Sequence, residues 1–250
     1  MLDKSDFLTF VDSDDCIAEN YVEHLLNINE NYPNYVPMCG MERFTGSIKG
    51  NKRTDNVITY KREKYCCNQY GIHPWACASL FSIDTIQKYN IRFEEKAKFA
   101  EDAYFVAKYC SYYDGVAVSQ AELYFYYMNP DGGAVNKGPN SFTRQDVLHR
   151  FTAYYAYKEA VDIIREHDKT LSEYCKAGFC FLAANILLMI ERTGYEDERM
   201  IDVLKKELSL RNRIIYTINC NNLKHIFMVN SVAINRRLAR VMLDKVIRHV

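Results

Sequence analysis

The sequence predicts an α/β domain over residues 1–140 followed by an all-helical region over residues 141–250. Two observations carry this prediction. In the first part, short apolar and β-rich runs alternate with helical patterns and turn residues, which is typical of a sheet with flanking helices. After Phe142 the pattern changes to long helical repeats joined by short polar links, without strand signals. With 250 residues, of which 48% are hydrophobic, the chain is long enough to bury a core.

The elements expected in the first part follow in order. An apolar run at residues 7–11 ends in four polar residues, as a buried strand running into a loop does. Residues 20–29 carry apolar side chains at helical spacing, so they predict a helix that ends before Pro33. A second helix is expected at 100–112, with Glu101 and Asp102 in its first turn. The remaining expectations are strands within 35–60, at 75–82 and at 123–128, and a short helix at 84–89.

Four helices are predicted in the second part, over residues 142–168, 170–193, 197–209 and 222–249. The longest apolar stretch, residues 177–190, has 14 residues and includes Asn185. Since a membrane-spanning helix needs about 20 residues, this stretch predicts a buried helix.

The charges balance overall but not along the chain. There are 32 basic and 32 acidic residues, yet residues 1–130 have a net charge of −5 and residues 131–250 a net charge of +5. Overall neutrality gives no general attraction to nucleic acid, so no such partner is expected. The nine cysteines form no C-x-x-C motif, and no apolar signal segment opens the chain. Both features predict reduced thiols in a cytoplasmic protein.

Three carboxylates, Asp12, Asp14 and Asp15, follow the first predicted strand. Open α/β sheets bind ligands at the carboxyl ends of strands, and like charges this close are costly unless they share a cation. One interpretation is therefore a site for Mg²⁺ or Mn²⁺ formed by the three aspartates, in which Asp12 and Asp14 hold the ion against substrate phosphates. The other is a solvated loop in which one aspartate caps the next helix.

Two enzyme classes place carboxylates at such a strand end. Haloacid-dehalogenase-like phosphatases have D-x-D followed by x-T or x-V, and Asp12-Ser-Asp14-Asp-Cys16 lacks the Thr or Val. The segment Phe7-Leu-Thr-Phe-Val-Asp-Ser-Asp-Asp-Cys-Ile17 resembles more closely the D-x-D segment of family 2 glycosyltransferases with a GT-A fold. Cys16 stands where that family usually has Trp or Tyr. Three further segments resemble the family in the same order: Trp75-Ala-Cys-Ala-Ser-Leu-Phe81, Ile91-Arg-Phe93 and Ala100-Glu-Asp-Ala-Tyr-Phe105.

The resemblance implies a partial GT-A-like sheet over residues 1–140 and gives roles to two acids. Asp102 is implied as the general base, which takes the proton from an acceptor hydroxyl as that oxygen attacks the anomeric carbon with inversion. Glu101 beside it is implied to orient the acceptor or the loop. The alternative is that both acids only complement the dipole of their helix.

The resemblance also implies a loop near the donor phosphates after residue 128. Met128 and Asn129 stand where the family often has an arginine, which leaves Lys137 as the candidate phosphate contact. Trp75, the one tryptophan, is expected either to stack on a sugar or to lie in the core.

The implied function is transfer of a sugar from a nucleotide-sugar to a saccharide or lipid-linked acceptor in polysaccharide biosynthesis. In the family a nucleoside-binding part precedes the D-x-D, and 11 residues precede Asp12 here. We therefore expect an N-terminally truncated chain that binds a nucleotide-sugar weakly or not at all. A non-catalytic interaction protein is the alternative from another class.

Basic residues dominate the end of the chain. Residues 224–250 carry six lysines and arginines against the single acid Asp244, beside an apolar stripe between Val232 and Ile247. Such a helix suits peripheral contact with the inner face of a membrane. The alternative is that the stripe packs on the preceding helices.

Overall fold

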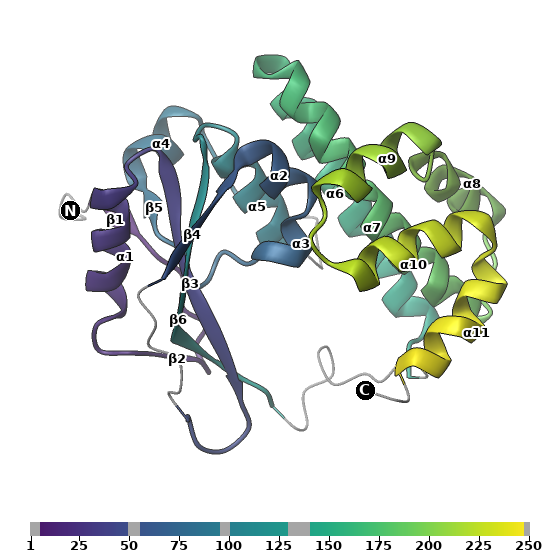
Figure 1. Cartoon of the computed structure of the whole chain (residues 1–250), viewed down its shortest axis with the longest axis horizontal. Helices are drawn as coiled ribbons and strands as arrows, with labels where there is room; N and C mark the ends of the chain where they lie inside the picture. The colour runs from purple at the N-terminus through teal and green to yellow at the C-terminus, as the bar shows by residue number, and fades with distance from the viewer. Residues whose placement is uncertain (1–5, 50–55, 96–100, 130–140, 248–250) are drawn as a thin grey trace. The chain divides into compact units, whose positions relative to one another are not determined.

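The computed structural model describes residues 6–49, 56–95, 101–129 and 141–247, and the chain divides into two compact units. The first unit comprises Met1–Tyr65, His73–Phe93 and Asp102–Asn136. The second comprises Cys66–Ile72, Glu94–Glu101 and Lys137–Val250. The first unit contains the sheets, whereas the described residues from 141 onward are helical (Figure 1).

Strand β6 (Gly115–Tyr127) is the centre of the main sheet. Strand β3 (Tyr35–Phe44) pairs with it in parallel. The other side of β6 pairs antiparallel with β4 (Val57–Lys61) along its first half and with β2 (Cys16–Ile17) near its end. A separate antiparallel pair joins β1 (Phe7–Leu8) to β5 (Phe81–Ser82). Three strands from different parts of the first unit, β2, β3 and β4, therefore all pair with the long β6.

Helices cover the sheets of the first unit. Helix α1 (Tyr21–Asn31) buries Tyr21, Leu25 and Ile28 on one face, as its helical spacing predicts. Helix α4 (Ile83–Lys88) begins at Ser82, whose hydroxyl accepts a hydrogen bond from the Thr85 amide. Helix α5 (Glu101–Cys110) is buried from its third residue onward. Two short helices, α2 (Arg62–Cys67) and α3 (Gln69–Ile72), lie between the strands in the sequence.

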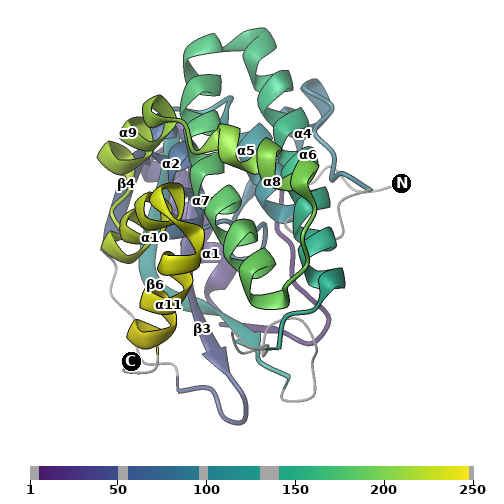
Figure 2. The same cartoon turned by 90° about the vertical axis from the view of Figure 1, so that its right-hand side faces the viewer.

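The second unit is built around helix α7 (Lys169–Thr193), which contacts five other helices (Figure 2). These are α6 (Arg144–His167), α8 (Glu198–Glu207), α9 (Leu210–Asn219), α10 (Leu223–Ile234) and α11 (Arg236–Ile247). Polar side chains cap the helix starts: Thr143 forms a capping box with Asp146, and Asp168 caps α7. Gly194 ends α7 with φ 67°, a left-handed conformation that favours glycine.

Helix α7 is also the one helix of the described chain that is long and apolar enough to cross a membrane. Two thirds of its apolar window, 67%, is buried inside the protein. This burial identifies α7 as a core helix and confirms the buried helix predicted for residues 177–190.

Several predicted elements differ from the observed ones. The strand expected at 7–11 is regular only at Phe7–Leu8, and the strand expected at 75–82 only at Phe81–Ser82. Isolated bridges, Phe10 to Cys77 and Met38 to Ser79, are found in place of longer strands. Between Cys77 and Ser79, Ala78 has a φ of 59°, which is outside the extended conformation of a strand. The helix expected at 222–249 is interrupted at Asn235, which has an extended backbone. Helices α2, α3 and α9 were not predicted.

Candidate active site

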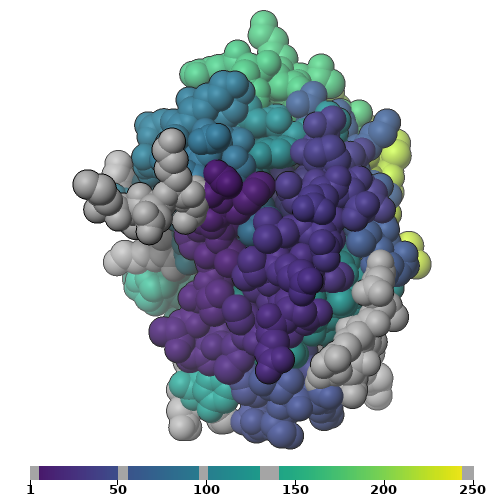
Figure 3. All heavy atoms as spheres, turned by 90° about the vertical axis from the view of Figure 1, so that its left-hand side faces the viewer, coloured from purple at the N-terminus to yellow at the C-terminus, as the bar shows by residue number. Residues whose placement is uncertain are grey.

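The aspartates form a tight turn after β1. The Asp15 amide donates to the Asp12 carbonyl at 3.1 Å, and the Asp12 and Asp14 side chains are exposed. Figure 3 shows that the N-terminal part of the chain, in purple, forms much of the surface on one side of the first unit. Two carboxylates are therefore presented to solvent from a backbone turn.

Asp15 differs from the other two aspartates because both of its oxygens accept hydrogen bonds. The Tyr124 hydroxyl donates to one at 2.6 Å, and the Tyr127 amide donates to the other at 2.8 Å. The Tyr124 oxygen in turn accepts from the Asp12 amide at 3.1 Å. Burial first, and the bond to Asp15 second, raise the pKa of Tyr124. Asp15 thereby fastens the aspartate turn to the end of β6.

The buried thiol of Cys77 is affected by charges from both acidic motifs. The pKa of Cys77 is raised first by burial and then by the negative charges of Asp102, Asp12 and Asp15. These carboxylates come from positions 90 residues apart in the sequence, yet each acts on the same side chain. Cys77 is therefore within range of charges from both acidic motifs.

An aromatic cluster holds these segments together. Phe10, just before the turn, contacts Phe81, Phe93 and Phe105 with ring centroids 5.2–5.7 Å apart. Phe93 stacks on Phe105 of α5 at 4.4 Å. Packing of this kind contributes about 0.5–1.5 kcal/mol per ring pair beyond buried area. The start of α5, and with it Asp102, is therefore fixed against the segment that carries Asp12.

Glu101 has different surroundings from Asp102. It is the first residue of α5, its side chain is exposed, and it belongs to the second unit. Its charge acts on the buried hydroxyl of Tyr70 in that unit, where the Arg150 charge opposes it. Nothing described brings the Glu101 side chain to Cys77.

Sequence reasoning missed a cation beside the aspartates. Arg43, exposed near the end of β3, lies 5.8 Å from the centre of the Trp75 ring. The pKa of Tyr126 is raised by burial, by Asp15 and Asp12 and to a smaller extent by Asp14, whereas Arg43 lowers it. Arg43 is thus opposite Tyr126 in the pairing of β3 with β6, and the charges of all three aspartates act on the same tyrosine. No sequence signal marks Arg43, because its place depends on the pairing of β3 with β6.

Trp75 matches neither of its two expected roles, sugar stacking or full burial in the core, completely. It is partly buried and packs against the core, while Arg43 lies over its ring. His73 contacts the ring edge with centroids 5.4 Å apart. The tryptophan is thus neither fully in the core nor a free stacking platform.

The residues present suit a divalent ion shared with a diphosphate. Within the part of the chain that the structure describes, no three His, Cys, Asp or Glu side chains gather into a complete metal site. Mg²⁺ commonly takes only one or two carboxylates and fills the remaining positions with phosphate oxygens and water. The exposed Asp12 and Asp14 offer such hard oxygen donors, whereas Asp15 already accepts two hydrogen bonds. Lys137, the expected phosphate contact, lies outside the described residues.

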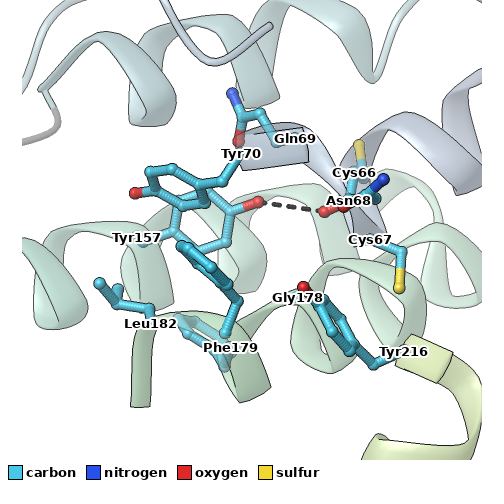
Figure 4. A pocket seen from close by; sticks show the side chains of 11 residues that line it. Cys66, Cys67, Asn68, Gln69, Tyr70, Tyr157, Gly178, Phe179, Leu182 and Tyr216 are labelled. Carbon is cyan, nitrogen blue, oxygen red and sulfur yellow. Dashed lines mark hydrogen bonds between the residues drawn. The ribbon is translucent and has the colours of Figure 1, made fainter. Parts of the chain in front are cut away.

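A pocket in the second unit is a poor substrate site. Residues Cys66–Tyr70 line it together with side chains of α6, α7 and α9, and Tyr157 donates to the Cys66 carbonyl at 3.4 Å (Figure 4). Its volume of about 10 Å³ holds one water molecule at most. A nucleotide-sugar is far larger than this cavity.

Comparison with known proteins shows which proteins the chain is similar to. No family model matches the chain. The minor teichoic acid biosynthesis protein GgaB of Bacillus subtilis (strain 168) is 23% identical over 170 residues, which are 66% of this chain and 18% of GgaB. The crystal structure of S. aureus TarS is 12% identical and has a TM-score of 0.54. The match covers 91% of this chain and 40% of the TarS chain. A structure of TarS 1–349 in complex with UDP-GlcNAc has a TM-score of 0.46 at 14% identity, over 92% of this chain and 68% of that chain.

The chain thus spans a minor part of the length of both relatives. Its fold is a partial GT-A-like α/β sheet with flanking helices, followed by an all-helical C-terminal region. The chain is thus similar to part of a protein of teichoic acid biosynthesis and shares its fold with part of S. aureus TarS.

Proposed function

We propose that the protein transfers a sugar from a nucleotide-sugar to a saccharide or lipid-linked acceptor, with inversion and with Mg²⁺ or Mn²⁺. One observation carries the proposal: Phe10, two residues before Asp12, forms a β-bridge with Cys77 and packs its ring on Phe105, three residues after Asp102. A transferase of this kind needs a metal-diphosphate site on one side of the anomeric carbon and a base on the other side. The packing of the two acidic segments against each other supports the assignment of the metal ligands to one segment and the base to the other.

Asp12 and Asp14 are the residues that would hold the ion. An ion bound there would neutralise the charge that develops on the departing nucleotide diphosphate. Asp15 and Tyr124 keep the turn in place, so that the two exposed carboxylates keep a fixed direction. Arg43 offers a further positive charge beside the same turn for phosphate oxygens.

Asp102 is the base in this proposal. Its carboxylate would accept the proton of the acceptor hydroxyl as the oxygen attacks the anomeric carbon, which makes the oxygen a stronger nucleophile. The packing of Phe105 of α5 on Phe10 and Phe93 keeps the start of this helix, and with it Asp102, in position. Glu101, exposed at the helix start, is left the role of orienting the acceptor.

The comparisons suggest the substrate classes. GgaB is named for teichoic acid biosynthesis, and S. aureus TarS, which shares the fold, has been crystallised with UDP-GlcNAc. We therefore propose a nucleotide-sugar as donor and a cell-surface polymer or its lipid-linked precursor as acceptor.

The test measures release of nucleotide diphosphate from UDP-sugars by the natural protein that contains residues 1–250, with and without Mn²⁺. Changing Asp102→Asn should lower turnover by about two orders of magnitude or more, the usual scale for loss of a general base. Affinity for Mn²⁺ and UDP, measured by calorimetry, should change less than about threefold, because in this proposal the donor phosphates are held by the metal at Asp12 and Asp14 and not by Asp102.

Asp84→Asn is the matched control, since Asp84 is also an acid in the first turn of a helix of the first unit. Equal losses of turnover in both variants would show that the two acids only stabilise the helices in which they lie. Collapse of donor affinity in Asp102→Asn would make Asp102 a binding residue. Absence of any Mn²⁺-dependent binding or turnover would favour the non-catalytic interaction protein.

A further inference from the structure

Three helices of the second unit leave large apolar side chains in solvent. These side chains are between 40% and 81% exposed. Large apolar residues normally occur singly on a surface, and a group of them marks an interaction site. We call this set the apolar face: Leu210, Ile214 and Ile218 of α9; Leu223, Phe227 and Ile234 of α10; and Leu238, Val241 and Met242 of α11.

Helical spacing places the set on one side of each helix. Residues 210, 214 and 218 follow each other at intervals of four, and residues 223, 227 and 234 also fall within a narrow arc at 100° per residue. The buried residues Tyr216 and Val232 lie on the opposite side of α9 and α10, whereas the buried Ala239 of α11 lies about 100° around the helix from Leu238. Helices α9 and α10 therefore each have two apolar sides, of which only one is buried.

The three helices form one outer layer. All three pack on α7, and α10 contacts both α9 and α11. Figures 1 and 2 show them together on the same side of α7. The alternative raised by the sequence, that the apolar stripe near the chain end packs on preceding helices, holds for Val232 but not for Ile234, Leu238 or Val241.

The layer is strongly basic. Residues 210–247 contain seven lysines and arginines and a single acid, Asp244. Glu173 and Glu191 of α7 pair with Arg211 and Arg236. Arg211 and Arg237 nevertheless keep about three quarters of their side chains exposed, 74% and 76%. Arg237 also lies within 4.0 Å of Glu191 and Glu196, so both arginines are in exposed ion pairs whose positive groups stay accessible to solvent.

A groove at the joint between α10 and α11 combines both properties. It has a volume of about 420 Å³ and is lined by the apolar Leu187, Val232 and Ile234 and by the basic Lys205, Arg236 and Arg237. An anionic headgroup with the start of its acyl chains has the same pairing of charge and apolar surface.

We propose that the apolar face of α9, α10 and α11 binds the surface of an anionic lipid bilayer. The apolar side chains enter the headgroup boundary, and the basic residues meet anionic headgroups. A second copy of this chain suits the face less well, because it would bring an equally basic layer against this one. The inference is independent of the proposed sugar transfer.

Sedimentation with vesicles tests the proposal. The protein should bind vesicles of phosphatidylcholine with 30% phosphatidylglycerol and not vesicles of phosphatidylcholine alone. Replacing Arg211, Lys224 and Arg237 by Gln should weaken binding by roughly a hundredfold, since each basic residue near the surface contributes about a fivefold factor. Ile218→Ser with Leu223→Ser and Ile234→Ser should weaken it at least about tenfold.

The control replaces three other exposed apolar residues, Val22, Ile48 and Tyr155, by Ser and should leave binding unchanged. Equal binding to both vesicle types, or no binding to either, would overturn the proposal. So would a dimer in light scattering that the apolar-face variant converts to a monomer without any vesicle binding by the wild type.

Discussion

At the scale of single residues, Asp15 stabilises the turn that carries Asp12 and Asp14. Its two oxygens accept from the Tyr124 hydroxyl and the Tyr127 amide, which joins the turn to β6. The exposed aspartates were predicted from their place after an apolar run. The anchoring role of Asp15 was not, because it depends on a strand more than 100 residues away.

Asp15→Ala should destabilise the first unit by about 1–3 kcal/mol, because it leaves a buried hydroxyl and an amide without their charged acceptor. Urea unfolding followed by the fluorescence of Trp75, the one tryptophan, measures this. Glu30→Gln, an exposed acid of α1, is the control and should change stability by less than about 0.5 kcal/mol. Equal stability of both variants would show that Asp15 does not hold the turn.

His73 gives the first unit a dependence on pH. Burial lowers its pKa to about 4 from the ordinary 6.5, and only the bond from Nε2 to the Cys77 carbonyl at 3.1 Å acts the other way. The unfolded chain therefore takes up a proton below pH 6.5 while the folded chain does not. The contribution of His73 to the free energy of unfolding is complete above pH 6.5. It falls by about 3 kcal/mol as the pH drops toward 4.

His73→Gln should flatten this dependence, because Gln can still donate to the carbonyl but does not titrate. Trp75 fluorescence in urea between pH 4.5 and 7.5 measures it, with His149→Gln in α6 as the control. An unchanged slope in His73→Gln would assign the pH dependence to other groups.

At the scale of elements, Gly115 lets β4 and β6 approach. A Cβ at this position would lie 1.9 Å from the Tyr60 carbonyl oxygen, a backbone atom of the paired strand. Gly115→Ala should therefore destabilise the first unit by about 2 kcal/mol or more. Gly46→Ala, where a Cβ meets nothing within 4 Å, is the control. Equal unfolding midpoints would show that the β4–β6 pairing adapts without cost.

The elements also show where local sequence stops deciding structure. Long helices such as α6 and α7 were predicted because period and caps agree. Helix α9 was missed because Ile214, Ile215 and Thr217 are β-branched, and burial of Tyr216 decides its conformation. The apolar run at 75–82 predicted a strand, but Ala78 with φ 59° interrupts regular pairing.

At the scale of the whole molecule, the order of motifs predicted the fold class better than any single element. The predicted α/β part and the helical part correspond to the two kinds of structure observed. The grouping of residues 66–72 and 94–101 with the second unit had no local signal, since it depends on packing between distant segments. For the same reason Arg43, Tyr124 and Cys77 entered the site only with the structure.

The central claim is that the turn at Asp12 and Asp14 holds a divalent ion against a nucleotide diphosphate, with Asp102 close by. Anomalous diffraction at the manganese edge, from crystals grown with Mn²⁺ and UDP, tests it most directly. The account predicts a manganese peak at coordination distance from an oxygen of Asp12 or Asp14 and from the diphosphate, with Asp102 facing the site as a non-ligand. A diphosphate and manganese bound elsewhere, or manganese held by Asp102, would contradict it.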